Sequence, residues 1–145
     1  FVHDEASAFF GGLAGNAGLF STAREVACVY QMLLNGGEID GRRYLSKETC
    51  QLFTTETSKI SRRGLGFDKP DADDPKKGNC APSAPVGVYG HTGFTGTCAW
   101  ADPVNELVYV FLSNRIYPDV TNRKLNQLHI RERIQGAIYD AMQNK

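Results

Sequence analysis

The stretch VYGHTGFTGTCAWADP, residues 88–103, decides the fold prediction for this chain. It has the character of a β-strand, yet Gly90, Gly93 and Gly96 interrupt it beside a histidine and a threonine. Glycine weakens a strand interior, and its repeated presence marks a bulge or a place where a ligand or another backbone comes close. We therefore expect something to approach this strand.

The residues around this stretch predict a three-stranded antiparallel meander. Residues 86–93, 96–102 and 106–114 have strand character, and the short connections between them favour antiparallel neighbours. The last strand contains a continuous apolar run, residues 107–112, which predicts burial on both of its faces.

Helical patterns flank these strands in the sequence. Residues 6–20, rich in glycine and alanine, are expected to form a loop. Thr22 and Glu25 have the spacing of a capping box, and Ser46 is placed to cap a second, shorter helix. GLGF, residues 64–67, is a short strand candidate. The chain closes with a predicted helix of about 15 to 20 residues. Its predicted core stripe is Ile130, Ile134, Ala137, Ile138 and Ala141. The expected fold class is α+β, an antiparallel sheet covered by helices.

The composition is that of an ordinary globular domain. Of the 145 residues, 41% are hydrophobic and 22% are charged. Sixteen basic residues balance sixteen acidic ones, so we expect neither nucleic acid nor an anionic membrane as a partner. No apolar run reaches the roughly 20 residues of a membrane span, which predicts a soluble chain. The chain begins at Phe1 in mid-pattern, and we expect it to be a piece of a longer polypeptide.

The acidic residues and the cysteines do not have the spacing of metal ligands. Asp71, Asp73 and Asp74 lack calcium-loop spacing, and successive residues of VHDE would point to opposite faces of a strand. No metal and no cofactor are therefore expected. The four cysteines have no CxxC spacing, so we predict buried free thiols, with a disulfide as the next alternative. They are Cys28, Cys50, Cys80 and Cys98.

The tripeptide His91-Thr92-Gly93, followed by a second TG, resembles the K-T-G strand motif of the penicillin-recognising serine hydrolases. The similarity is to the branch of class C β-lactamases, D-amino-acid peptidases and related esterases, many of which have histidine in place of lysine. Residues 14–37, 64–68 and 101–115 also resemble segments of this family, so the resemblance covers nearly the whole chain. It implies a β-lactamase/transpeptidase-like fold.

The same resemblance implies that residues 1–145 are the C-terminal portion of a single, incomplete β-lactamase-like domain. The family's nucleophilic serine belongs to an S-x-x-K motif, and a Y-x-N or S-x-N motif follows it. Neither occurs here; the nearest approaches are residues 121–124 and 58–61. We therefore expect the chain to be inactive alone, and the N-terminal part of the same polypeptide to be its partner.

Roles for the motif residues follow from the resemblance. Phe94, directly after the motif's glycine, would offer its backbone N–H to the oxyanion of the reaction. Gly93 would keep the strand free of a Cβ where substrate lies, and Thr92 would hydrogen-bond a substrate carboxylate or carbonyl oxygen. His91 would assist by hydrogen bonding and, when protonated, by its positive charge.

Asn114 and Arg115 follow the last predicted strand. In this family, polar residues of that region can reach a substrate carboxylate, so Asn114 is a substrate-binding candidate. Capping of the strand end is an equally good interpretation of the pair.

Two functions remain open. The first is a serine hydrolase of the β-lactamase, D-Ala peptidase or esterase kind, which transfers an acyl group from a small-molecule or peptide substrate. The alternative is a non-catalytic module for packing or ligand binding beside another enzyme domain. The family also implies an extracytoplasmic bacterial location, periplasmic or secreted.

The apolar last strand also predicts self-association of the chain. In the family it pairs with a strand from the N-terminal part of the domain, so residues 107–113 would be an exposed edge here. Such edges recruit partners, and we predict a dimer or strand exchange through them.

Overall fold

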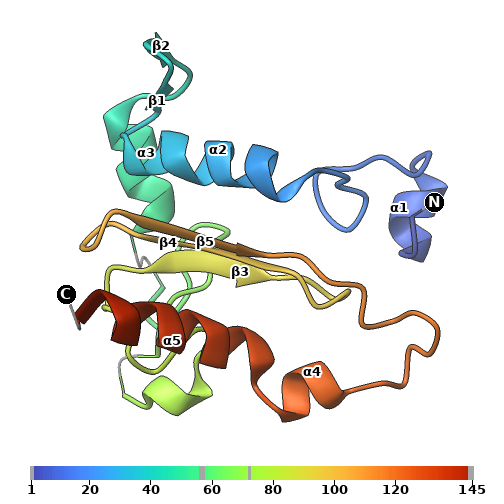
Figure 1. Cartoon of the computed structure of the whole chain (residues 1–145). Helices are drawn as coiled ribbons and strands as arrows, with labels where there is room; N and C mark the ends of the chain where they lie inside the picture. The colour runs from blue at the N-terminus through green and yellow to red at the C-terminus, as the bar shows by residue number, and fades with distance from the viewer. Residues whose placement is uncertain (1, 56–57, 72, 144–145) are drawn as a thin grey trace.

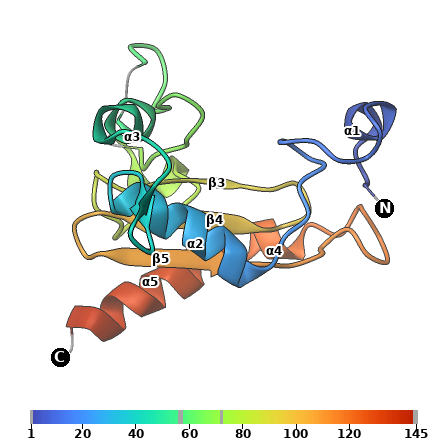
Figure 2. The same cartoon turned by 90° about the horizontal axis from the view of Figure 1, so that it is seen from above.

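Three antiparallel strands lie between two layers of helices in the computed structural model (Figure 1), which describes residues 2–55, 58–71 and 73–143. The strands are β3 (Tyr89–Thr92), β4 (Cys98–Asp102) and β5 (Leu107–Phe111), paired in the order β3-β4-β5. Helix α2 (Ala23–Leu34) covers one face of this sheet, where it lies over β4 and β5 (Figure 2), and α5 (Ile130–Gln143) covers the other. The predicted α+β fold with a three-stranded meander is therefore confirmed.

The register of β3 and β4 places the core. Gly90 lies opposite Trp100, and His91 lies opposite Ala99. Because side chains alternate along a strand, Trp100 enters the α5 face while Ala99 faces α2. The small side chains on the α2 face let that helix approach, and the large indole fills the other layer. The main hydrophobic cluster consists of Cys80, Val88, Cys98, Trp100 and Tyr109.

The helix starts are set by the predicted caps. The Thr22 side chain accepts from the Glu25 backbone N–H at 3.3 Å, and the Glu25 carboxylate accepts from the Thr22 backbone N–H at 2.9 Å. Ser46 caps α3 (Lys47–Thr54) by accepting from the Thr49 N–H at 3.1 Å. Between these helices, β1 (Glu38–Ile39) and β2 (Arg42–Arg43) form a small hairpin that the sequence did not predict.

Two predictions near the N-terminal half are wrong. Residues 6–9 of the expected loop belong to a short helix, α1 (Glu5–Phe9), which begins here because the Asp4 side chain caps it at the Ser7 N–H. Residues 64–67 form no strand of the sheet; instead Asp68 makes an isolated antiparallel bridge to Gly90. The pairing with β3 is therefore made by Asp68, directly after this segment.

The predicted apolar stripe of the last helix is correct only in part, since Ile138 packs against the hydrophobic cluster of the sheet. The buried side chains of α5 are Arg131, Gln135 and Tyr139, whereas Ile134 is 38% exposed. Polar atoms on this face find partners in distant segments: Gln135 Oε1 accepts from the Ala81 N–H at 2.8 Å. These bonds offset the desolvation of the buried polar groups. A separate short helix, α4 (Lys124–Gln127), precedes α5.

Burial of the cysteines and of β5 follows the predictions in part. Cys50, Cys80 and Cys98 are buried and free, but Cys28 is exposed. Burial raises the pKa of Cys80 to about 12, which makes its thiol a poor nucleophile at neutral pH. In β5 only Tyr109 is buried and its other residues are half-buried, so burial on both faces is incomplete.

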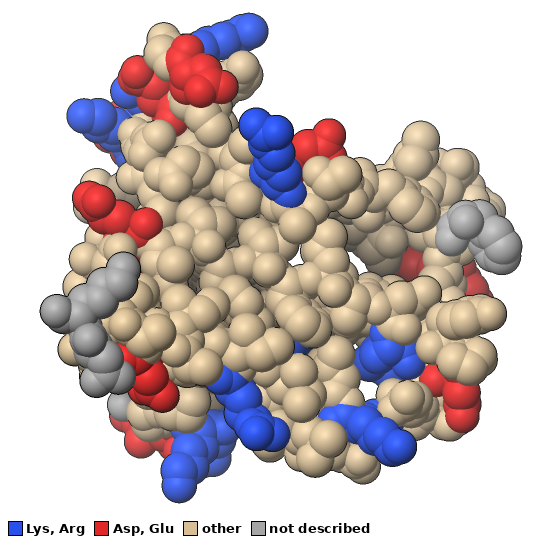
Figure 3. Space-filling view, viewed as in Figure 1, with Lys and Arg blue, Asp and Glu red and all other residues tan. Residues whose placement is uncertain are grey.

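The outer surface shows no concentration of one charge on the face drawn in Figure 3. Basic and acidic side chains lie mostly around its rim, and the centre is largely uncharged. Among the described residues, no helix is both long and apolar enough to cross a bilayer.

Candidate active site

The outer edge of β3 is open only beyond Gly90. Asp68 pairs with both backbone groups of Gly90. Its N–H donates to the Gly90 carbonyl at 2.7 Å, and its carbonyl accepts from the Gly90 N–H at 3.0 Å. Backbone groups of an antiparallel edge strand face outward at every second residue, so the next outward N–H belongs to Thr92. The free edge therefore begins at the HTG motif.

Phe94 continues this edge with an unbonded amide. The preceding residue turns inward, where the Gly93 N–H donates to the Thr97 carbonyl at 2.8 Å. None of the hydrogen bonds formed within the described segments has the Phe94 N–H as its donor. Its side chain is 62% exposed. A backbone donor of this kind can stabilise a developing oxyanion.

The rest of Phe94 is held firmly. Arg115 Nε donates to the Phe94 carbonyl at 2.8 Å, and the same guanidinium lies 4.7 Å from the centre of the Phe94 ring. His3 stacks on this ring with a centroid separation of 5.6 Å. Arg115 Nη1 is bound to the carbonyls of Val120 and Asn122. Arg115 thus binds backbone carbonyls beyond the end of β5. This is the capping role that the sequence offered as an alternative to substrate binding.

His91 is bonded through both ring nitrogens. Nδ1 lies 2.6 Å from the Thr92 carbonyl, and Nε2 lies 2.9 Å from Nη1 of Arg63. A guanidinium only donates, so Nε2 must accept and the proton must be on Nδ1, where the carbonyl accepts it. These two partners assign the neutral Nδ1–H tautomer.

The glycines of the motif have reasons within the protein itself. A Cβ on Gly90 would collide with the Ala99 carbonyl and lie 2.6 Å from Cε3 of Trp100, and one on Gly93 would collide with the Thr97 hydroxyl. Gly96 has a φ of +97°, which favours glycine at this turn. Packing within the sheet is thus enough to require glycine at Gly90, independently of any ligand.

A polar pocket of about 460 Å³ adjoins the free edge on the α5 side. Three of the predicted site residues contribute to it: Thr92, Gly93 and Phe94. His91 and Asn114 are not among its described lining residues, since strand alternation sends His91 to the opposite face and Asn114 lies exposed beyond β5. Its remaining lining is mainly basic or amide-bearing: Lys76, Lys77, Gly78, Asn79, Arg115, Asn126, His129, Arg131 and Glu132.

An ion pair between the half-buried Arg62 and the buried Asp68 supports the Asp68 bridge. Arg62 Nη2 donates to Asp68 Oδ2 at 3.0 Å, and Arg62 Nε lies 2.8 Å from Oδ1 without the alignment of a hydrogen bond. Asn79 Nδ2 also donates to Oδ2, at 2.6 Å. Burial alone would raise the pKa of Asp68, but the bonds from Asn79 and Arg62 outweigh it and lower this pKa below its ordinary value.

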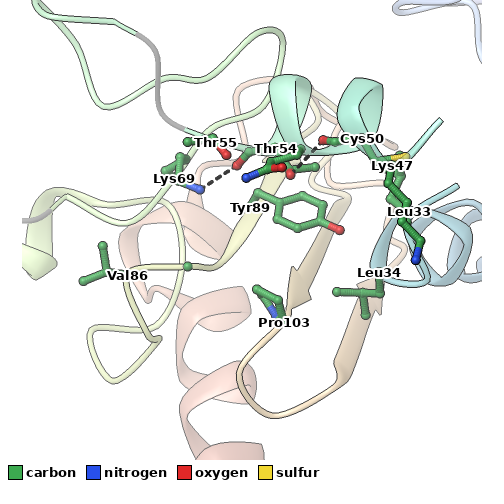
Figure 4. A pocket seen from close by; sticks show the side chains of 13 residues that line it. Leu33, Leu34, Lys47, Cys50, Thr54, Thr55, Lys69, Val86, Tyr89 and Pro103 are labelled. Atoms are coloured by element: carbon green, nitrogen blue, oxygen red, sulfur yellow. Dashed lines mark hydrogen bonds between the residues drawn. The ribbon is translucent and has the colours of Figure 1, made fainter. Parts of the chain in front are cut away.

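The larger of the two described pockets, about 500 Å³, lies at the other end of β3 (Figure 4). Tyr89 projects into it, and Lys69 Nζ at its wall donates to the Thr54 carbonyl at 2.7 Å. Its lining includes none of the motif residues, so we centre the candidate site on the polar pocket and the free edge.

The metal alternatives have structural roles instead. Asp71 accepts the backbone N–H groups of Asp73 and Asp74, and Asp4 caps α1. Across the described segments, no three His, Cys, Asp or Glu side chains gather in a metal-binding group.

Arg63 and the stacking of His3 on Phe94 were missed by sequence reasoning. Arg63 is 28 residues from His91 and belongs to no recognisable motif, so its contact depends wholly on how the loop before β3 folds. No signal in the sequence identifies it.

Comparison with known families places this fold. A family model described as Beta-lactamase matches residues 2–132. The chain therefore belongs to the Beta-lactamase family, whose members are serine hydrolase-like acyl-transfer proteins.

Its relatives are longer proteins. Sequences from Escherichia coli O157:H7 and Salmonella agona, each named "Putative D-alanyl-D-alanine carboxypeptidase", are 36% identical over 132 residues. These matches cover 86% of this chain and 29% of each relative, so the chain spans less than a third of their length. A crystal structure of a penicillin-binding protein homologue from Caulobacter crescentus matches with a TM-score of 0.52 and 25% identity. That match covers 65% of this chain and 26% of the other.

Proposed function

We propose that this chain supplies the β3 side of an acyl-transfer site in a serine hydrolase that cleaves peptide amide bonds. The observation that carries the proposal is the Phe94 N–H, which is unbonded within the described residues and lies at the end of the HTG strand. In acyl transfer, such a donor stabilises the charge that develops on the carbonyl oxygen.

The kind of substrate is argued from the relatives and from the pocket. The relatives' names specify a carboxypeptidase of D-alanyl-D-alanine. A polar pocket with basic lining beside Thr92 suits a substrate that carries a carboxylate. A D-Ala peptidase is therefore favoured over an esterase. An extracytoplasmic bacterial location forms part of this proposal and rests on the family resemblance.

The chain alone should lack turnover. Its sequence contains no S-x-x-K motif, and an enzyme of this kind without its nucleophile loses most of its rate acceleration. We expect the purified 145-residue chain to hydrolyse a chromogenic cephalosporin no faster than buffer does. The N-terminal part of the same polypeptide is proposed to bring the nucleophile, so that residues 1–145 complete one domain with it.

A chimera tests the function directly. In the Escherichia coli relative, the matching 132-residue segment is replaced by residues of this chain, and acylation by a fluorescent penicillin is followed on a gel. We expect labelling that the replacement of the relative's nucleophilic serine by alanine abolishes. A folded chimera that takes up no label, beside a relative that does, would favour the non-catalytic module instead.

A further inference from the structure

We propose that the cavity at the start of β3 is a binding site for a monocarboxylate with a linear apolar chain, a medium-chain fatty acid. Tyr89 and Lys47 would bind the carboxylate, and the apolar walls of the cavity would bind the chain. The cavity shares no described lining residue with the HTG motif or with the polar pocket. The inference is therefore independent of the proposed hydrolase function.

The cavity has the size and the lining of a small-molecule site (Figure 4). Its volume of about 500 Å³ lies within the range of ligand pockets, about 300–1,000 Å³. Its walls come from the end of α2, from α3, from the start of β3 and from the turn between β4 and β5. The apolar side chains among them are Leu33, Leu34, Cys50, Val86, Tyr89 and Pro103. A chain of methylene groups therefore finds apolar contacts on several sides.

Tyr89 presents a hydroxyl group to this cavity. The residue is only 3% exposed, and its ring packs against Tyr30 and Phe67 with centroid separations of 6.4 and 5.2 Å. The hydroxyl points across the cavity, and none of the hydrogen bonds within the described residues involves it. Burial raises the pKa of Tyr89, so the hydroxyl stays protonated and can donate. A buried donor without a partner is costly, and a ligand oxygen would satisfy it.

Lys47 brings a positive charge to the same cavity. A Cβ on Gly36 would lie 3.1 Å from Cγ of Lys47, so the glycine leaves room for the lysine stem at the cavity wall. In Figure 4 the Lys47 ammonium and Leu34 lie on the side toward which the Tyr89 hydroxyl points. No carboxylate in the described segments lies within ion-pair distance of Lys47. This ammonium can therefore bind an anion at the mouth of the cavity.

The charges of the lining fit an anion and not a cation. Its described charged side chains are Lys47 and Lys69, and it contains no described carboxylate. Lys69 Nζ donates to the Thr54 carbonyl, so the head group of the ligand is assigned to Lys47. An ammonium and a hydroxyl can both donate to one carboxylate, and such bonds are stronger than those to a neutral acceptor. The pair of donors therefore favours a carboxylate over an alcohol or an amine.

Three probes test the proposal on the chain itself. Octanoate, octanamide and hexanoate are titrated into the ¹⁵N-labelled chain, and the amide shifts of Gly36, Cys50 and Gly87 report binding in the cavity. We expect octanoate to bind about tenfold more tightly than octanamide, which has the same chain without the charge. Hexanoate should bind about 15-fold more weakly than octanoate, because each buried methylene group favours binding about fourfold.

Substitutions test the two contacts with the head group. Lys47→Gln should abolish the preference for octanoate over octanamide, and Lys47→Arg should retain it because the charge is kept. Tyr89→Phe should weaken octanoate binding about fivefold, since it removes one hydrogen bond and keeps the ring. Lys124→Gln, an exposed change on α4 outside the described lining of both pockets, is the matched control. It should leave all three affinities unchanged.

Several results would overturn the proposal. Equal affinities for octanoate and octanamide, or an unchanged preference in Lys47→Gln, would show that Lys47 binds no carboxylate here. Unchanged octanoate affinity in Tyr89→Phe would contradict the hydroxyl contact, and equal affinities for octanoate and hexanoate would place the chain outside the cavity.

The location of the shifts is equally decisive. Shifts confined to the exposed Phe9 and Phe10, or no shifts at about 10 mM octanoate, would show that the cavity is not a site for this ligand. None of these results bears on the proposed hydrolase function, which the chimera tests separately.

Discussion

Arg115 fixes Phe94 from the carbonyl side while leaving its amide unbonded. The 2.8 Å bond to the Phe94 carbonyl and the cation over its ring constrain the turn that carries the proposed oxyanion donor. We expect Arg115→Gln to increase amide hydrogen exchange about tenfold at Gly96, whose N–H donates to the Gly93 carbonyl within this turn, since a bond to a charged donor is worth about 1.5–3 kcal/mol. Global stability should change by less than about 1 kcal/mol because the side chain is near the surface.

The control for this prediction is Arg133→Gln, which removes the same charge from an exposed helix position. Exchange at Gly96 should stay at the level of the unmodified chain. Equal exchange in the two variants would mean that the turn is held by its own backbone bonds, including the Arg115 N–H to the Thr95 carbonyl.

The Arg62–Asp68 pair predicts acid sensitivity. The folded state lowers the pKa of Asp68 below its ordinary value of 3.8. Between the folded and the unfolded pKa, the unfolded state therefore binds more protons than the folded state does. The stabilisation is thus complete above that value and is lost as the pH falls through the lower, folded pKa. Asp68→Asn should destabilise the chain by about 1–3 kcal/mol at pH 7. It should also flatten the fall in stability below pH 4, measured by urea unfolding at several pH values.

The outcome that contradicts this assignment is a parallel fall in stability for Asp68→Asn and the unmodified chain between pH 4 and pH 2. In that case other carboxylates dominate the acid response. Asp73→Asn is the matched control, since Asp73 is exposed and its carboxylate forms no ion pair within the described residues.

The packing of Gly90 against Trp100 predicts an intolerant strand position. Gly90→Ala should lower the free energy of unfolding by about 1–3 kcal/mol, because the added methyl overpacks the indole and the β4 backbone. Gly15→Ala is the control, as an added Cβ there meets nothing within 4 Å. Thermal unfolding of both variants checks the difference. Equal midpoints would show that the sheet accommodates the added methyl group at no cost in stability.

The sequence predicted what local patterns determine. The capping box at Thr22 and the strand around Gly90 depend on residues close in the chain, and both are found. The polar residues on the buried face of α5 were missed, because Gln135 is stabilised by Ala81, 54 residues away. Arg63 was missed for the same reason, since its contact with His91 depends on tertiary folding. The motif identified the edge of β3, whereas the groups that orient it became visible only in three dimensions.

The outer edge of β5 predicts self-association. The strand is the last of the sheet, and the register with β4 leaves the backbone N–H groups of Val108 and Val110 facing outward. We expect the chain to form dimers at tens of micromolar by light scattering. Val110→Pro should return it to a monomer because the outward donor is lost, while Val110→Ala keeps the donor and should remain dimeric. A monomeric unmodified chain would contradict the prediction.

Removing the Phe94 N–H tests the proposed oxyanion donor more directly than any side-chain change. In the chimera with the Escherichia coli relative, Phe94→Pro deletes the donor and Phe94→Ala keeps it while removing the ring. We expect the proline variant to lower the acylation rate by about 10²–10³, the usual effect of losing one oxyanion donor. The alanine variant should stay within about tenfold, since only the contacts of the ring with His3 and Arg115 are lost. Circular dichroism and thermal unfolding confirm that both variants fold. Equal rates for two folded variants would show that the Phe94 amide takes no part in the reaction, because the ring and not the N–H would then account for any loss.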